Sequence, residues 1–319
     1  MIRFLRQVAC ILFFSAVTGA MAQAPQKDFR AVDEFVKKLG TLDSLNMGTI
    51  SGIVTKPFSD KTEKARAIFD WIAYNISFDC KLARTGNSQK DASTIVLQTR
   101  MATASGYAAL FQDMCSAANI RCLIPDGYVK LKTGQIGESQ PELNHTWAVV
   151  QLGQSPEEWF YVDPAWGSGY TDADMKVFTR SFNDAYFFAN KQIFNWQHYP
   201  DNEGWKLGPA SKNLKDFYAL PLIGGAAYEL GLQKFSPGYG SVKVTTGQAA
   251  SFSFTLDAKT VVEKVSLRIG EPKKQKLKDI PFTFDKGILS FNHKFEDGDY
   301  PVLVEVNGKE LVAYSVESE

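Results

Sequence analysis

The stretch that decides the fold spans residues 103–131 and reads TASGYAALFQDMCSAANIRCLIPDGYVKL. Its first half is rich in alanine and predicts a helix over Thr103–Ala118, which we expect to stop at Asn119. The large apolar residues of this helix recur at helical spacing: Tyr107, Leu110, Phe111 and Met114. The second half predicts a strand over Cys122–Leu131, so a helix that leads into a strand forms the centre of the fold.

The segments on either side extend this helix-then-strand order. Two helices are predicted upstream, at Ala31–Leu39 and Lys61–Ile76, and Asp60 is a suitable capping residue for the second. Two strand-like runs follow downstream, at Thr146–Leu152 and Trp159–Val162. Helices first and antiparallel strands afterwards, within one unit, predict an α+β domain.

The C-terminal part has a different pattern. It contains seven short runs of alternating apolar residues, most of them separated by turns with Gly, Asp or Asn: 241–246, 251–256, 261–269, 280–284, 288–293, 300–306 and 310–316. This spacing is typical of a small, immunoglobulin-like β-sandwich. Four lysines (Lys273, Lys274, Lys276, Lys278) are predicted to lie in a solvated connection. We place the two domains at residues 23–235 and 236–319.

Composition excludes several classes of function. The chain of 319 residues has 35 basic and 35 acidic residues, three histidines and four cysteines. A balanced charge without a basic face argues against a nucleic-acid partner. No Cys-x-x-Cys pair is present, so the sequence predicts neither a metal site nor a cofactor.

The N-terminus has the pattern of a secretory signal peptide over residues 1–22. Arg3 and Arg6 precede an apolar run at Val8–Ala20, and Ala-x-Ala patterns end it at residues 20–24. A membrane anchor is the alternative, but polar residues follow the run at once and it is short for a span. We therefore expect export to a periplasmic or extracellular location, with no membrane span in the mature chain.

Cleavage after residue 22 would leave three cysteines: Cys80, Cys115 and Cys122. An odd number allows at most one disulfide. Two alternatives stay open for Cys115 and Cys122, which are either joined to each other or packed as buried thiols.

A histidine and an acid lie at matching positions of the predicted hairpin. If the turn is centred near Gln154, then His145 and Asp163 are symmetric about it. Directly opposite residues have Cβ atoms about 4.5–5.5 Å apart, so the carboxylate could orient the imidazole. Such a pair is the second half of a Cys/His/Asp arrangement, although a purely structural pairing is equally compatible with the sequence.

The same segments resemble the transglutaminase-like superfamily, which has a papain-like core. Residues 100–130 resemble its nucleophile segment, most closely the Arg-x-Ala-Val-Cys-x-Gly-Tyr-Ala pattern of the kyphoscoliosis-peptidase and cytokinesis-protein branch. "NHTWAVV" (144–150) and "WFYVDPAW" (159–166) match its His and Asp motifs. "KARAIFDWIAYNISFD" (64–79) resembles its upstream helix, and residues 184–207 resemble the segment after the Asp, with its His-x-Pro.

The resemblance implies a role for three residues. His145 would be the catalytic base and Asp163 the acid that orients it, while the nucleophile position falls on Ala104. A methyl group cannot replace a thiolate. Cys115 is about 16 Å further along the helix, and Ser105 is turned by about 100°, so neither is expected to substitute for the missing thiol.

Further side chains are expected around this site. Trp147 and Trp166 could line a cleft beside the His and the Asp, together with Ser105, although packing beneath the site is an alternative for the tryptophans. His198 and His293 have no partner motif, and the sequence assigns them no function.

Three hypotheses for the function follow. The first is an exported, catalytically inactive protein that binds a protein, peptide or cell-wall ligand in the former active-site cleft. The second is an active cysteine peptidase or transglutaminase-type acyl transferase in which the native nucleophile has been substituted by Ala104. The departures at Thr103 and Ser105 favour a natural loss, because an engineered change would alter one residue. The third is a structural or adhesive surface protein in which the sandwich is the working part.

Overall fold

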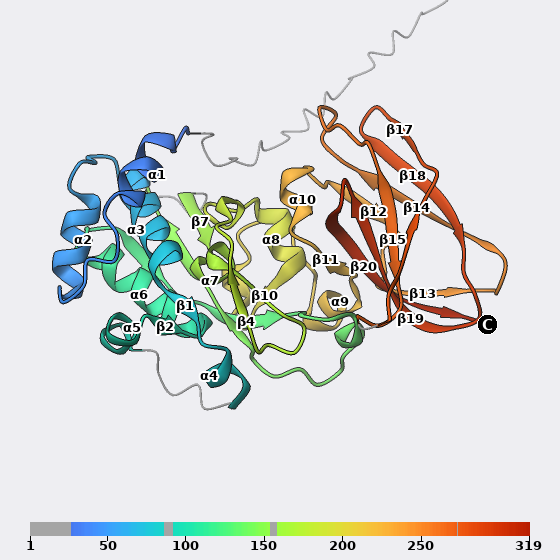
Figure 1. Ribbon diagram of the computed structural model, residues 1–319, viewed down its shortest axis with the longest axis horizontal. Helices are drawn as coiled ribbons and strands as arrows, with labels where there is room; N and C mark the ends of the chain where they lie inside the picture. Colours follow the sequence, from blue (N-terminus) through green and yellow to red (C-terminus); the bar gives the residue numbers. More distant parts are fainter. Residues whose placement is uncertain (1–26, 86–91, 154–157, 273) are drawn as a thin grey trace, which may run out of the picture.

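The computed structural model describes residues 27–85, 92–153, 158–272 and 274–319, with the α+β part and the β-rich part side by side (Figure 1). The predicted signal peptide lies outside the described residues. Among the residues that are described, no helix is long and apolar enough to cross a membrane.

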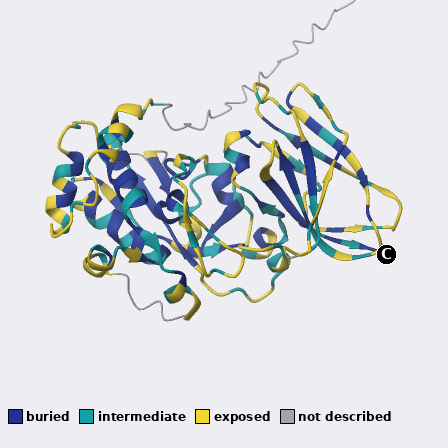
Figure 2. Cartoon of the chain, in the orientation of Figure 1, coloured by how far each residue is buried: buried dark blue, intermediate teal, exposed yellow. Residues whose placement is uncertain are grey.

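Six helices form the first part of the α+β domain: α1 (Arg30–Lys37), α2 (Met47–Thr55), α3 (Lys61–Asn75), α4 (Cys80–Thr85), α5 (Ser93–Thr99) and α6 (Ala104–Ala117). The Asp60 carboxylate accepts hydrogen bonds from the backbone of Thr62 and Glu63, which confirms the predicted cap of α3. Helix α6 ends where Asn119 adopts a left-handed φ of 58°, as predicted for its stop. Buried residues are concentrated along α3 and α6 (Figure 2).

Two small sheets pack beside these helices. One has the order β3 (Arg121–Leu123), β6 (Ala148–Gln151), β7 (Trp159–Val162). The other has the order β10 (His198–Pro200), β4 (Asp126–Val129), β5 (His145–Thr146). The single strand predicted over Cys122–Leu131 is therefore wrong. It is divided at Pro125, which has no N–H to donate to a ladder, and its halves join different sheets.

Glycine at position 127 allows the second sheet to close over its neighbours. A Cβ atom here would lie 2.3 Å from the carbonyl oxygen of Tyr199 and 2.5 Å from the ring of Trp147. Only a residue without a side chain fits between β10 and the indole. This close approach brings β10 and β5, which both pair with β4, to one place in the fold.

Shorter elements complete the part of the chain before the sandwich: β1 (Ser77–Phe78), β2 (Met101–Ala102), α7 (Pro164–Ser168), β8 (Gly169–Thr171), β9 (Phe178–Arg180), α8 (Lys191–Gln197), α9 (Leu214–Ala219), α10 (Ala226–Glu229) and the 3₁₀ turns at Thr133–Gln135, Asp184–Tyr186 and Glu203–Trp205.

The C-terminal part is a β-sandwich of ten strands: β11 (Leu222–Ile223), β12 (Lys234–Ser236), β13 (Ser241–Val244), β14 (Ala249–Thr255), β15 (Val265–Ile269), β16 (Lys276–Asp279), β17 (Thr283–Asp285), β18 (Ile288–Lys294), β19 (Gly298–Val306) and β20 (Lys309–Ser318). One sheet has the order β11-β20-β19-β15-β16, with β13 also on β20, and the other has the order β12-β14-β18-β17. Phe252 of the second sheet meets Tyr314 of the first at 5.5 Å between ring centroids. The predicted fold class, a papain-like α+β core followed by a β-sandwich, is confirmed.

Two details of the sandwich differ from the prediction. The lysines at 276 and 278 lie in the strand β16 and not in a loop. Because β16 is an edge strand with every residue exposed, it lacks the apolar alternation by which a strand is recognised, and lysine suits such an edge. Strand β12 pairs with β14, so this sheet takes in residues that precede position 236.

The structure answers the open question about the cysteines. Cys80, Cys115 and Cys122 are all buried free thiols. Burial raises the pKa of the Cys115 thiol well above its usual value, and the Cys122 thiol beside it acts in the same direction. Among the described residues, packing and not a disulfide accounts for this pair.

Candidate functional site

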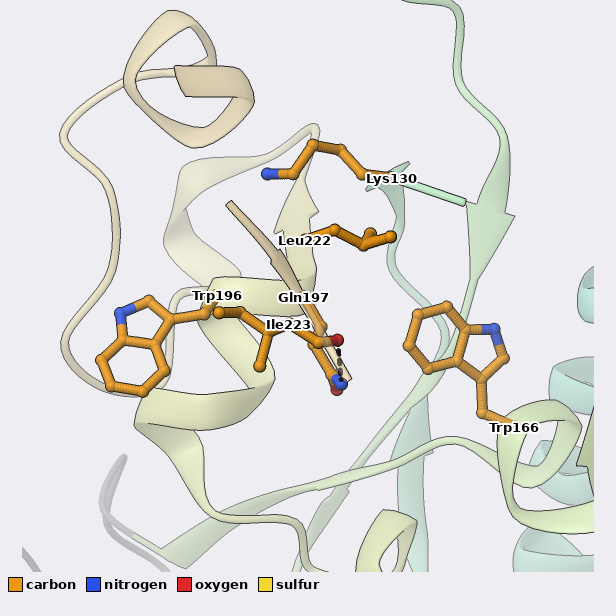
Figure 3. Close-up of a pocket in the computed structure, with 6 residues that line it drawn as sticks. All are labelled: Lys130, Trp166, Trp196, Gln197, Leu222 and Ile223. Carbon is orange, nitrogen blue, oxygen red and sulfur yellow. Dashed lines mark hydrogen bonds between the residues drawn. The ribbon is translucent and has the colours of Figure 1, made fainter. Parts of the chain in front are cut away.

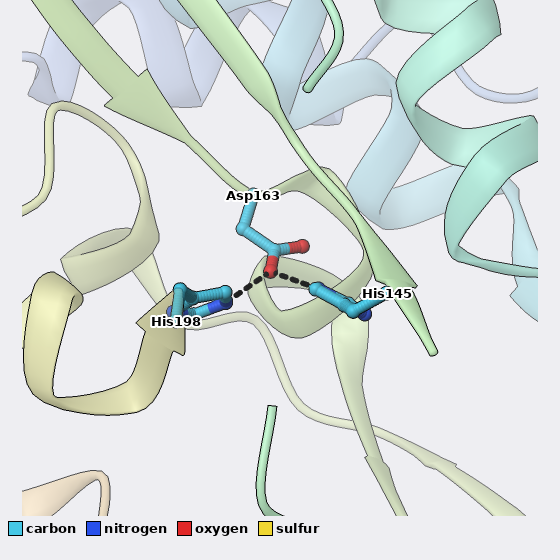
Figure 4. Close-up of side chains that lie close together, drawn as sticks. All are labelled: His145, Asp163 and His198. Carbon is cyan, nitrogen blue, oxygen red and sulfur yellow. Dashed lines mark hydrogen bonds and ion pairs between the residues drawn. The ribbon is translucent and has the colours of Figure 1, made fainter. Parts of the chain in front are cut away.

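His145 and Asp163 are in direct contact in the interior (Figure 4). Nε2 of His145 lies 2.7 Å from Oδ2 of Asp163, and both side chains are at most 5% exposed. A carboxylate can only accept, so in the neutral ring Nε2 carries the hydrogen and donates it. Nδ1 then keeps its lone pair and points away from Asp163, as a general base requires.

The contact does not arise from the predicted hairpin register. Strands β6 and β7 pair Ala148 with Val162 and Gln151 with Trp159, which centres the turn on residue 155, one residue from the prediction. His145 lies outside this ladder, because β5 pairs with β4 through Gly127. The pair forms because the chain changes sheets at Trp147 and the acid stands at the end of β7.

Asp163 is fixed by the start of a helix. It is the N-cap of α7, and its Oδ1 accepts a hydrogen bond from the backbone N–H of Trp166 at 3.0 Å. Pro164 at the first helical position favours this cap. One carboxylate oxygen is thus used by the backbone, and the other is available to histidine.

A second histidine, His198, completes the cluster and was missed at the sequence level. Its Nε2 lies 3.2 Å from Oδ2 of Asp163, and its Nδ1 lies 3.2 Å from the carbonyl oxygen of Phe194. The ring is fully buried and stacks on Phe194 with 3.8 Å between centroids. The available signal was the His-x-Pro motif, but nothing in its spacing places residue 198 beside residue 163.

Burial and charge act in opposite directions on this cluster. Burial by itself would raise the pKa of Asp163, but the charge and hydrogen bond of His145, with those of His198, hold it well below its usual range. Burial lowers the pKa of His198 to about 4, against the hydrogen bond to Asp163. At neutral pH the acid is therefore a carboxylate and His198 is neutral.

Ala104, the predicted nucleophile position, is the first residue of α6. It is buried, and α6 packs against β5, the strand that begins at His145. The oxygen of the Ser105 side chain lies 3.1 Å from that of Thr103, at the N-cap of the same helix. A thiol at position 104 would benefit from the helix N-terminus, whereas the methyl group present has no nucleophilic chemistry.

The two tryptophans occupy different environments. Trp147 is fully buried and packs on Phe194 and on the ring of His198, so it lies beneath the site and does not line a cleft. Trp166 is only partly buried and its ring lies 5.3 Å from that of His145. Burial of an indole below the histidines has the physical role of fixing both imidazole planes.

A small cavity adjoins the site. It has a volume of about 10 Å³ and is lined by Trp166, Lys130, Trp196, Gln197, Leu222 and Ile223 (Figure 3). This is room for about one water molecule. This cavity is too small for a peptide.

Lys130 on the wall of this cavity is buried, and no acidic side chain among the described residues pairs with it. Its Nζ donates to the carbonyl oxygen of Phe217 at 2.5 Å and lies 4.0 Å from that ring. Burial lowers the pKa of Lys130 to about 7. In the unfolded chain the pKa of this lysine is near its usual 10.5. Between pH 7 and pH 10.5 the unfolded state therefore binds more protons than the folded state, and the free energy of unfolding rises with pH.

We expect the free energy of unfolding to rise by about 2 kcal/mol between pH 7 and pH 9 on account of Lys130. Lys130→Met should remove this rise, since an apolar side chain does not titrate. Urea unfolding at several pH values measures it, with Lys132→Met as an exposed neighbouring control. An unchanged slope in Lys130→Met would show that the ammonium is not desolvated.

The cluster has the donor types of a metal site. Among the described residues, His145, Asp163 and His198 offer two imidazole nitrogens and one carboxylate oxygen, all within 4.8 Å of one another. The sequence predicted no metal site, because three histidines and four cysteines without a Cys-x-x-Cys pair leave too few clustered ligands.

Comparison with known proteins shows which chains this one is similar to. The model of the transglutaminase-like superfamily matches residues 49–164. The chain is 30% identical to kyphoscoliosis peptidase of Mus musculus over 250 residues, which cover 75% of this chain and 37% of that protein. It is 25% identical to cytokinesis protein 3 of Schizosaccharomyces pombe over 168 residues, 53% of this chain and 18% of that protein.

Among solved structures, "Crystal structure of a TGase" aligns with 54% of this chain and 40% of its own, at 14% identity and a TM-score of 0.30. The chain spans little more than a third of the length of kyphoscoliosis peptidase, and less of cytokinesis protein 3. The matched residues contain the helix of Ala104 and both members of the His145–Asp163 pair. Residues 49–164 therefore form a domain that matches the transglutaminase-like superfamily.

Proposed function

We propose that this protein is an exported, catalytically inactive member of its superfamily that binds a protein, peptide or cell-wall ligand over the former active site. The observation that carries the proposal is an ordered His145–Asp163 pair beside a helix that begins with Ala104. The pair keeps the geometry of a base and its orienting acid, while the nucleophile position holds a methyl group. The basic and apolar pattern of residues 1–22 supports export.

Two exposed apolar side chains that lie close in the sequence to site residues support ligand binding. Met101 is 42% exposed and precedes Ala104 by three residues, and Leu143 is 52% exposed and precedes His145 by two. Met101 is therefore separated from Ala104, and Leu143 from His145, by only a few residues of chain. Apolar side chains at such positions offer contact area to an extended peptide.

Substituting these residues tests the proposal. The chain would be immobilised and panned against a phage-displayed random peptide library, and binding to purified peptidoglycan would be measured in parallel. We expect Met101→Glu and Leu143→Glu each to weaken binding of a selected peptide or of peptidoglycan by about tenfold, because a charge replaces desolvated contact area.

Leu277→Glu is the matched control, since Leu277 is 57% exposed on the sandwich edge. Equal loss of binding in all three variants would contradict a site near residue 104. Cleavage or amide transfer by the unaltered chain, retained in Ser105→Ala, would refute the absence of catalysis.

The alternative function is an active cysteine peptidase or acyl transferase whose nucleophile has been substituted. The 2.7 Å contact between His145 and Asp163 favours it, because an abandoned active site has no catalytic need for that geometry. The name of the similar protein, kyphoscoliosis peptidase, points to the same chemistry. Sequencing codon 104 in the source gene decides between the two: a cysteine codon supports the alternative, and an alanine codon supports the natural loss.

A further inference from the structure

We propose that His145, Asp163 and His198 form a site for a divalent transition-metal ion, for which Zn²⁺ is the best match. Each of the three comes from a different part of the chain: the start of β5, the N-cap of α7 and the start of β10. Two imidazoles and one carboxylate are the protein ligands in one common class of zinc site. The inference is independent of whether the protein binds a peptide.

The argument starts from the two nitrogens of His198. Nδ1 faces the carbonyl oxygen of Phe194 and Nε2 faces Oδ2 of Asp163, and both oxygens can only accept. The neutral ring has one N–H, so one of its two nitrogens presents a lone pair to an acceptor oxygen; with the hydrogen on Nδ1, that nitrogen is Nε2, 3.2 Å from Oδ2 of Asp163. Two electron-rich atoms that face each other in a dry interior require a cation between them. A proton or a metal ion meets that requirement, and the surroundings favour the metal.

The distances suit a metal ion with little rearrangement. Zn²⁺ ligands at about 2.0–2.1 Å in tetrahedral geometry lie roughly 3.3 Å from one another. Here Oδ2 of Asp163 is 3.2 Å from Nε2 of His198 and 2.7 Å from Nε2 of His145, and all three ligand atoms lie within 4.8 Å. His145 has to move outward slightly and carry its hydrogen on Nδ1, which points away from Asp163 (Figure 4).

The groups that hold His198 and Asp163 in place are also those expected around a metal site. Histidine ligands usually donate their other N–H to a backbone carbonyl, as His198 does to Phe194. Ligating carboxylates are usually fixed by a hydrogen bond, as Asp163 is by the backbone N–H of Trp166. Phe194, Trp147 and Trp166 pack around His198 and exclude water, which strengthens the attraction between the ion and the carboxylate.

The test measures zinc binding by the full chain after removal of metals with EDTA. Calorimetric titration with ZnCl₂ should give one site per chain, and Co²⁺ should give the visible absorption of a tetrahedral nitrogen–oxygen site. We expect His145→Gln and His198→Gln each to weaken Zn²⁺ binding by at least about tenfold.

Two controls make the result specific. His293→Gln changes the remaining histidine, which lies on the sandwich, and Cys115→Ala removes a buried thiol that could itself bind zinc; both should leave the affinity unchanged. Circular dichroism checks that each variant is folded. The Co²⁺ absorption is measured on the unaltered chain, so it tests the proposal even if a variant does not fold. Absence of binding at 100 µM Zn²⁺, or equal affinity in His198→Gln, would overturn the proposal and leave a proton as the shared cation.

Discussion

Ala104→Cys is expected to create a thiol that reacts with iodoacetamide at pH 6 roughly 50 times faster than an unperturbed cysteine. The new side chain would stand at the first position of α6, where the helix N-terminus stabilises a thiolate. The imidazole of His145, held by Asp163, would take the proton. An unperturbed thiol with a pKa of about 8.5 is less than 1% ionised at pH 6, so a depressed pKa has a large effect on the rate.

Two variants distinguish a restored site from a merely exposed thiol. Ser105→Cys places the same group one residue further along the helix, turned away from the histidine, and should react at the ordinary rate. Adding His145→Asn to Ala104→Cys should remove most of the gain. EDTA is kept in the buffer so that no bound cation competes for the histidine. Equal rates for the two cysteine variants would mean that position 104 is not the former nucleophile position.

Arg66→Met is expected to lower the free energy of unfolding by about 3–5 kcal/mol. Arg66 lies on the buried side of α3 and is 2% exposed. Its Nε and Nη2 donate to the two oxygens of Asp33 at 3.0 Å each, and Nε lies 3.0 Å from Oδ1 of Asp70. The guanidinium also lies 5.2–5.7 Å from the centroids of four aromatic rings: Phe29, Phe69, Phe182 and Phe187.

The expected loss has a specific cause. Methionine keeps most of the volume of the arginine stem, so the packing is largely preserved and the missing charge accounts for the effect. Burial raises the pKa of Asp70 to about 9, against the pull of Arg66, so this carboxyl is already protonated at neutral pH. The charge left without its partner is then mainly that of Asp33, which is bound to Arg66 through both oxygens.

Urea unfolding followed by tryptophan fluorescence measures the change in Arg66→Met. Arg30→Met is the control, because Arg30 forms an exposed pair with Asp28, and such pairs contribute at most about 1 kcal/mol. If Arg66→Met lost no more stability than Arg30→Met, then Arg66 would not be a structural centre of the helical part.

The periodic spacing of apolar residues was sufficient to predict the helices α3 and α6. The apolar face of α3 and the alanine-rich helix α6 were placed to within a residue, because one amphipathic face specifies a helix wherever it packs. Arg66 and Asp70 on α3 were not predicted to be buried, since a charged residue enters a core only when distant partners meet it. Strand β16 was missed for the opposite reason, because an exposed edge has no apolar signature.

The candidate site also has one part that the sequence predicted and one part that only the structure shows. The motifs around residues 145 and 163 were sufficient to pair His145 with Asp163, although the register from which that pairing was first inferred is off by one residue. The loss of a nucleophilic thiol at position 104 stays a prediction. By itself, the sequence determined the α+β class, the sandwich, the family and the absence of a cysteine at position 104. Only the tertiary structure brought His198 onto Asp163, 35 residues further along the chain. That contact depends on β10 and β5 pairing with the same strand, β4, and no pattern along the chain encodes which strands share a neighbour.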